Sequence, residues 1–88
     1  MARVLASIKV FPSDPSADLT RLKAQIQKRL PGDVSVMFQE EPVAFGLVAL
    51  IADLLMPEDA DGKMDEVENT LRSTEGVSEI QVVSVRRA

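Results

Sequence analysis

The order of the expected strands and helices is the feature that most limits how this chain can fold. Alternating apolar and polar residues predict strands at about 4–11, 34–39 and 78–85, and a continuous apolar run predicts a further strand at 43–52. Apolar residues at helical spacing predict helices at about 19–30 and 64–72. This order, in a chain of 88 residues, predicts one α+β domain spanning residues 1–88. We expect a ferredoxin-like split β-α-β sandwich, with a four-stranded antiparallel sheet and two helices on one face.

The placement of the strands follows from handedness. Right-handed crossovers put the first and third strands in the centre of the sheet. The third strand agrees, because the run Val43–Ala52 is apolar on both faces and is interrupted only by Gly46. In the last strand, we expect Ile80 and Val82 on one face and Val83 and Val85 on the other. The sheet face without helices is expected to be free for a partner.

Local signals set the expected ends of the helices. Either Ser16 or Asp18 is expected to cap the first helix, and the sequence does not decide between them. Pro31-Gly32 is expected to end that helix, and Gly76 to end the second.

The composition excludes several classes of chemistry. The chain has no Cys and no His, so disulfides, thiolate metal sites, cysteine nucleophiles and histidine general bases are absent. Carboxylates, Lys, Arg, Ser and Thr remain for any chemistry, but we expect a protein that docks onto another protein, is not an enzyme and needs no cofactor. A net charge of −4 makes direct nucleic-acid binding unfavourable. The longest apolar run is too short for a bilayer, which takes about 20 residues, and no leader is visible before the first strand. We expect a cytoplasmic protein.

Two acidic segments could in principle hold a metal ion or perform acid–base chemistry. The loop Glu58-Asp59-Ala60-Asp61-Gly62 lacks the alternating oxygen ligands of a calcium loop, so a solvated acidic turn is favoured over a divalent-cation site. Glu40 and Glu41 are adjacent on a strand and should point to opposite faces. A polar strand end is therefore favoured over a catalytic carboxylate pair.

Other functions of this fold require residues that the chain lacks. A metal carrier needs a Cys pair, and an RNA binder needs aromatic residues along the central strands, where this chain has only Phe11 and Phe45 near strand ends. An acyl-phosphate hydrolase needs a glycine-rich loop after the first strand. The loop here, residues 12–16, has no Gly and carries a carboxylate.

Phe45 and the terminal arginines are the candidates for binding. Pro42 stiffens the approach to Phe45, and Gly46 allows another backbone to come close. From these residues alone, Phe45 is either a core side chain at a strand start or an exposed aromatic anchor at an interface. Arg86 and Arg87 are expected in a C-terminal tail, where they are either solvated or able to grip a carboxylate or a phosphate.

The sequence resembles the archaeal elongation factor 1-beta family. The resemblance lies in Ala6-Ser7-Ile8-Lys9-Val10, in Glu41-Pro42-Val43-Ala44-Phe45-Gly46-Leu47-Val48-Ala49-Leu50, in Glu75-Gly76-Val77-Ser78 and in Val85-Arg86-Arg87. The middle block is the specific one.

This resemblance implies a guanine-nucleotide exchange factor for elongation factor 1-alpha, a GTPase. It implies that Phe45 enters an apolar pocket on the GTPase, and we expect Pro42 and Gly46 to belong to the same binding site. It also implies that Arg87, with Arg86 beside it, reaches the Mg²⁺ and phosphate region. We expect a monomer with no membrane or nucleic-acid partner. The alternatives are a small-molecule-binding regulatory module of the same fold and a minor enzyme such as an acyl-phosphate hydrolase.

Overall fold

The expected order of elements is confirmed. The computed structural model describes residues 3–58 and 62–88. Its elements are β1 (Arg3–Pro12), α1 (Leu19–Arg29), β2 (Ser35–Pro42), the short 3₁₀ turn η1 (Ala44–Gly46), β3 (Val48–Pro57), α2 (Lys63–Ser73) and β4 (Val77–Arg87).

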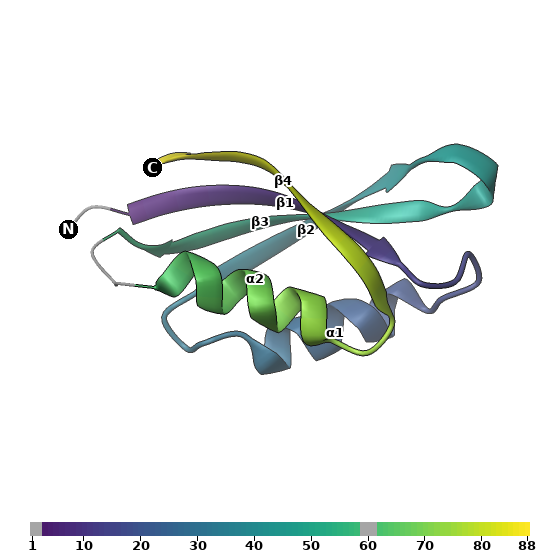
Figure 1. The fold of residues 1–88 in the computed structure, drawn as a ribbon, viewed down its shortest axis with the longest axis horizontal. Coiled ribbons are helices and arrows are strands. Elements are labelled where there is room, and N and C mark those ends of the chain that lie inside the picture. Colours follow the sequence, from purple (N-terminus) through teal and green to yellow (C-terminus); the bar gives the residue numbers. More distant parts are fainter. Residues whose placement is uncertain (1–2, 59–61) are drawn as a thin grey trace.

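The sheet is antiparallel and has the strand order β2-β3-β1-β4, so β1 and β3 are central as expected. Both helices cover the same face of this sheet, and the opposite face carries no helix of the described chain (Figure 1). The fold is the ferredoxin-like sandwich that the sequence predicts.

The core lies between the sheet and the helices. Its completely buried side chains come from alternate positions of the two central strands and from the inner stripe of each helix. The largest of them are Ile8, Val10, Ile26, Leu50, Leu54, Val67 and Leu71. The edge strands contribute only partly buried residues to this core.

The helix ends show which of the expected capping and stop residues are used. Asp18 caps α1, because its carboxylate accepts a hydrogen bond from the backbone N–H of Arg21 at 3.1 Å. The helix ends at Leu30, before Pro31. α2 ends at Thr74, and Gly76 then turns the chain into β4 with a φ of 95°.

Two expectations about the strands are wrong. The apolar run does not form a strand from residue 43, because Ala44–Gly46 is a turn and β3 begins at Val48. An apolar run has no periodicity that separates a turn from a buried strand, so the sequence could not show this boundary.

The last strand is also longer than expected and contains a bulge. β4 continues through Arg87, so both arginines belong to the strand and not to a tail. Val82 pairs with Ile8 but Val85 pairs with Ala6, so Val83 is an extra residue in the ladder. The bulge places Val85 on the same face as Val82, contrary to the simple alternation.

Candidate functional site

Phe45 lies at the tip of the β2–β3 hairpin, where the chain reverses in a strained turn. The backbone N–H of Leu47 donates to the carbonyl of Ala44 at 3.2 Å. Between them, Phe45 has a φ of 61° and Gly46 a φ of 76°. Positive φ at both central residues is the geometry of a type I′ turn, in which Asn, Asp or Gly normally takes the first position. A bulky aromatic residue in that position is an outlier.

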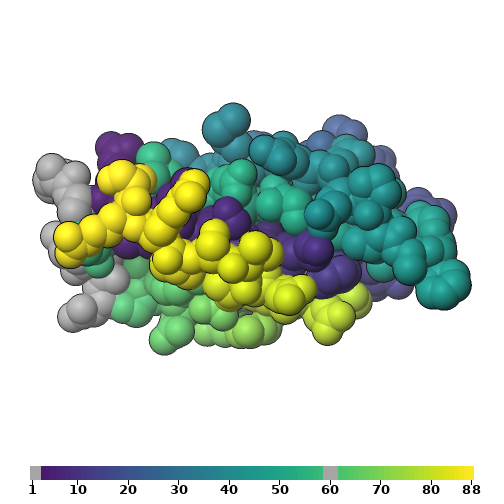
Figure 2. Space-filling model, turned by 90° about the horizontal axis from the view of Figure 1, so that it is seen from above, coloured from purple at the N-terminus to yellow at the C-terminus, as the bar shows by residue number. Residues whose placement is uncertain are grey.

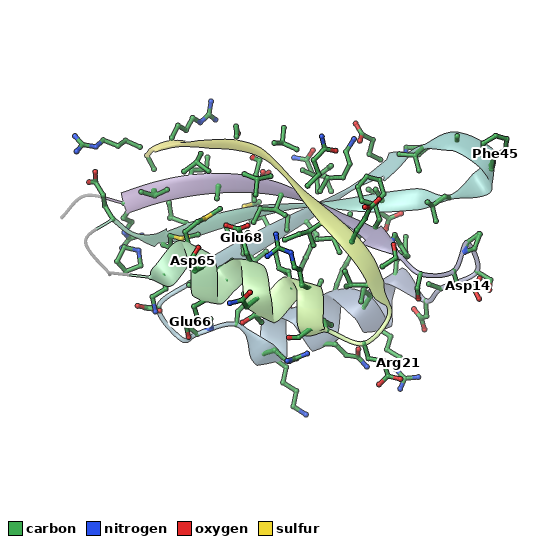
Figure 3. The ribbon with its side chains drawn as sticks, viewed as in Figure 1. Asp14, Arg21, Phe45, Asp65, Glu66 and Glu68 are labelled. Atoms are coloured by element: carbon green, nitrogen blue, oxygen red, sulfur yellow. The ribbon has the colours of Figure 1, made fainter. Side chains whose placement is uncertain are left out.

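The Phe45 side chain has no role in the core. It is 99% exposed, and it projects from the far end of the hairpin (Figure 3). Phe45 is therefore a surface residue and not a core side chain, a choice that the sequence left open. Pro42 ends β2 opposite Val48, three residues before the tip. The backbone of Phe45 is strained by its positive φ, and its side chain is exposed. Local strain of this kind is found mostly at binding sites and active sites.

The two arginines lie at the end of β4. Arg86 pairs with Leu5 and Arg87 with Val4 of β1, and the backbone N–H of Ala88 donates to the carbonyl of Arg3 at 3.0 Å. The backbone that carries both cations is thus fixed by regular sheet pairing.

Arg87 also makes an ion pair with Glu58, the first residue of the expected acidic loop. Its Nε donates to Oε1 of Glu58 at 2.6 Å. Residues 59–61 of that loop lie outside the described residues. Among the residues that the structure does describe, no group of three or more carboxylates is arranged to hold a metal ion.

A shallow cavity of about 320 Å³ opens at the same end of the molecule. Its apolar lining comes from β1, β3, α2 and β4, and charged residues stand at its rim. The residues are Val4, Met56, Met64 and Val85, with Glu58 and Lys63 among the charged ones. The arginine end of the sheet therefore combines cations with some accessible apolar surface.

The two candidate sites lie at opposite ends of the molecule. Figure 1 shows the C-terminus at one end of the long axis and the β2–β3 hairpin at the other, and the greatest extent of the molecule is 41 Å. Since β3 runs between these ends with a rise of about 3.3 Å per residue, Phe45 and Arg87 are separated by roughly 30 Å. The structure thus does not bring the predicted site residues together.

The helix-free face of the sheet joins these ends. Figure 2 shows β4 in yellow crossing this side toward the C-terminus, while the teal hairpin projects at the other end. Ser7 donates to Asp53 at 2.6 Å on this face, and the Lys9 ammonium lies 2.6 Å from the Glu41 carboxylate. Met37 is 75% exposed. The face is a mixture of paired polar groups and single apolar side chains.

The other carboxylates considered for catalysis or anion binding make local ion pairs and hydrogen bonds. Glu40 pairs with Lys23 of α1 at 3.0 Å, on the sheet face opposite to Glu41, so the two carboxylates diverge as expected. In the loop after β1, the Asp14 carboxylate accepts hydrogen bonds from the backbone N–H and the hydroxyl of Ser16. These bonds, the backbone one first, hold the pKa of Asp14 below its usual value. A loop with a fixed negative charge is unsuited to binding an acyl phosphate.

Comparison with known proteins identifies the family. The model of the EF-1 guanine nucleotide exchange domain matches residues 5–88 of this chain. The chain belongs to this family. Its role is therefore that of a nucleotide exchange factor in translation elongation.

Curated relatives support this assignment over the full length. Elongation factor 1-beta from Staphylothermus marinus is 43% identical over 88 residues, covering 99% of this chain and 98% of the relative. The protein of the same name from Methanothermobacter thermautotrophicus is 46% identical with the same coverage, and that from Sulfolobus acidocaldarius is 45% identical over 85 residues, covering 96% of this chain and 94% of the relative. These relatives are archaeal.

The fold alone is shared more widely. The solution structure of the C-terminal domain of the MgtC protein from Mycobacterium tuberculosis superposes with a TM-score of 0.65 at 17% identity, covering 99% of this chain and 88% of that one.

In the part of the present chain that is described, no helix is long and apolar enough to cross a membrane.

Proposed function

We propose that this protein accelerates the exchange of GDP for GTP on elongation factor 1-alpha by contacting the GTPase with both ends of its sheet. The observation that carries the proposal is the exposure of Phe45 on a left-handed turn at the hairpin tip. An aromatic residue held in this way is suited to enter an apolar pocket on a partner, where such residues often dominate the binding energy. Pro42 and Gly46 shape the turn that presents it.

The arginines supply the second contact. A GTPase holds GDP through phosphate contacts and Mg²⁺. An exchange factor must bind the nucleotide-free GTPase more tightly than the GDP-bound form, because only such a difference shifts the equilibrium. Arg86 or Arg87, placed near the phosphates, competes electrostatically with Mg²⁺ and so weakens the hold on GDP. No covalent bond has to change.

Because the two ends of the sheet are far apart, we assign them different roles in nucleotide exchange. Phe45 and Arg87 are too far apart to enter one pocket, so they contact two regions of the GTPase. We expect the hairpin contact to set mainly the affinity of the complex, and the arginine contact to set mainly the rate of GDP release within it. We take the active species to be a monomer in the cytoplasm, acting without nucleic acid or membrane.

The test is the release of a fluorescent GDP analogue from the cognate elongation factor 1-alpha, followed at increasing concentrations of this protein. Phe45→Ala should raise the concentration needed for half-maximal acceleration. Removal of residues 86–88 should lower the maximal rate. If wild-type protein in large excess leaves GDP release unchanged, the proposed function is wrong.

A further inference from the structure

The Arg87 guanidinium is held by a specific contact before any partner arrives. Glu58 directly follows β3, and Arg87 ends β4; the two strands flank β1. The hydrogen bond from Arg87 Nε to Glu58 Oε1 is 2.6 Å long. It links the residue that follows β3 to the last residue of β4, with β1 between these two strands. The Glu58 side chain is 27% exposed, whereas that of Arg87 is 80% exposed. The acid is thus the less exposed member of the pair.

The atom that makes the contact decides what it can do. A guanidinium has five N–H donors in a rigid plane, one on Nε and four on the two Nη atoms. Within the described residues, the side-chain hydrogen bonds of Arg87 run through Nε only. The Nη edge, which matches the spacing of two phosphate oxygens, is left for another acceptor.

We propose that Glu58 is a positioning residue for nucleotide exchange: it holds Arg87 by Nε so that the Nη edge faces the phosphate region of the bound GTPase. This inference rests on the proposed function. Its physical basis is that a flexible side chain loses conformational freedom when it binds, and a side chain that is already held loses less.

A different role for the same pair would have the opposite consequence. If Glu58 were a latch that neutralises Arg87, its removal would free the cation and raise the rate of exchange. If Glu58 positions Arg87, its removal lowers the rate. Since an exposed ion pair contributes at most about 1 kcal/mol, we expect Glu58→Ala to slow GDP release from elongation factor 1-alpha by about two- to fivefold.

Arg87→Lys provides the sharper test, because a lysine side chain has a single nitrogen. The ammonium group of this variant cannot donate to Glu58 from one atom and to a phosphate from others in a fixed plane. In the Arg87→Lys background, Glu58 therefore competes with the phosphate for the ammonium group. Glu58→Ala should then accelerate exchange, although it slows exchange when Arg87 is present. The same sign of effect in both backgrounds would overturn the inference.

A matched control separates positioning from net charge. Glu68 pairs with Arg72 along α2 at 3.3 Å, and Glu68→Ala changes the net charge by the same amount as Glu58→Ala. We expect Glu68→Ala to leave exchange unchanged. An equal slowing by both variants would show that overall charge, and not the contact to Arg87, is responsible.

The contact can also be measured without the GTPase. In ¹H–¹⁵N spectra of the isolated protein, the Nε–H signal of Arg87 should shift and exchange faster with water in Glu58→Ala, and less so in Glu58→Gln, which keeps an acceptor oxygen. An unchanged signal would overturn the inference while wild-type exchange activity persisted. Failure of the inference and failure of the proposed function are therefore distinguishable.

Discussion

The hairpin end and the arginine end of the sheet present their side chains in different ways. At the hairpin, a single apolar side chain is presented by an unfavourable turn, and the strands behind it are regular. At the other end, the backbone of β4 pairs with β1 up to the last residues, and the side chains are cations. Apolar burial gives affinity without needing a precise charge environment, whereas a cation acts on phosphate only if its position is fixed. This comparison suggests an anchor at one end and an electrostatic effector at the other.

The largest expected effect tests the anchor. Phe45→Ala should weaken binding to elongation factor 1-alpha by about 30-fold or more, as expected for an interface residue worth at least about 2 kcal/mol. The free energy of unfolding should change little, because the side chain is 99% exposed. Calorimetric titration with nucleotide-free GTPase and urea unfolding measure the two quantities. A stability loss of about 3–5 kcal/mol would instead indicate a core residue.

The next effect concerns the arginine end. Arg87→Ala should reduce the maximal rate of GDP release by about tenfold or more, since a charge-assisted hydrogen bond contributes roughly 1.5–3 kcal/mol. Arg86→Ala, measured in parallel, shows which of the two cations is the effector. Half-maximal concentrations should change less than they do for Phe45→Ala. If both arginine variants altered only affinity, the division of tasks between the ends would be wrong.

A smaller effect measures the strain in the hairpin. Asn accepts a left-handed conformation more readily than Phe, so Phe45→Asn should stabilise the isolated domain by about 0.5–1 kcal/mol. Exchange activity should fall as it does in Phe45→Ala. Urea midpoints of the two variants provide the comparison. Equal stability of Phe45→Asn and Phe45→Ala would mean that the turn carries no strain.

The smallest effect lies in the helix layer, where Lys63 begins α2 near the arginine end. The hydrogen bond to the Asp33 carboxylate, at 3.0 Å, raises the pKa of Lys63 above its ordinary value of 10.5. The stability from this pair is therefore complete below the ordinary pKa and is lost as the pH rises through the raised one. Asp33→Asn should be slightly less stable than wild type at pH 8, and the difference should shrink at strongly alkaline pH. Exchange activity at neutral pH should not change.

The candidate site could be predicted only in part. The resemblance to a known family pointed to Pro42, Phe45, Gly46, Arg86 and Arg87, and their binding roles stay predictions. Whether Phe45 is buried could not be decided, because an apolar residue at a strand entrance fits both a core and a surface position. The contact between Arg87 and Glu58 could not be predicted, because a contact between residues 29 positions apart in sequence leaves no local signal.

What the sequence by itself determined was the order of the elements, the central position of the first and third strands, and the divergence of Glu40 and Glu41. These follow from periodicity and handedness, which act over a few residues or through general rules of chain crossing. The tertiary structure decided that Ala44–Gly46 is a turn, that a bulge at Val83 realigns the end of β4, and that Arg87 meets Glu58. Each of these depends on which strand lies beside which, and in what register, and that is set only when the whole sheet is assembled.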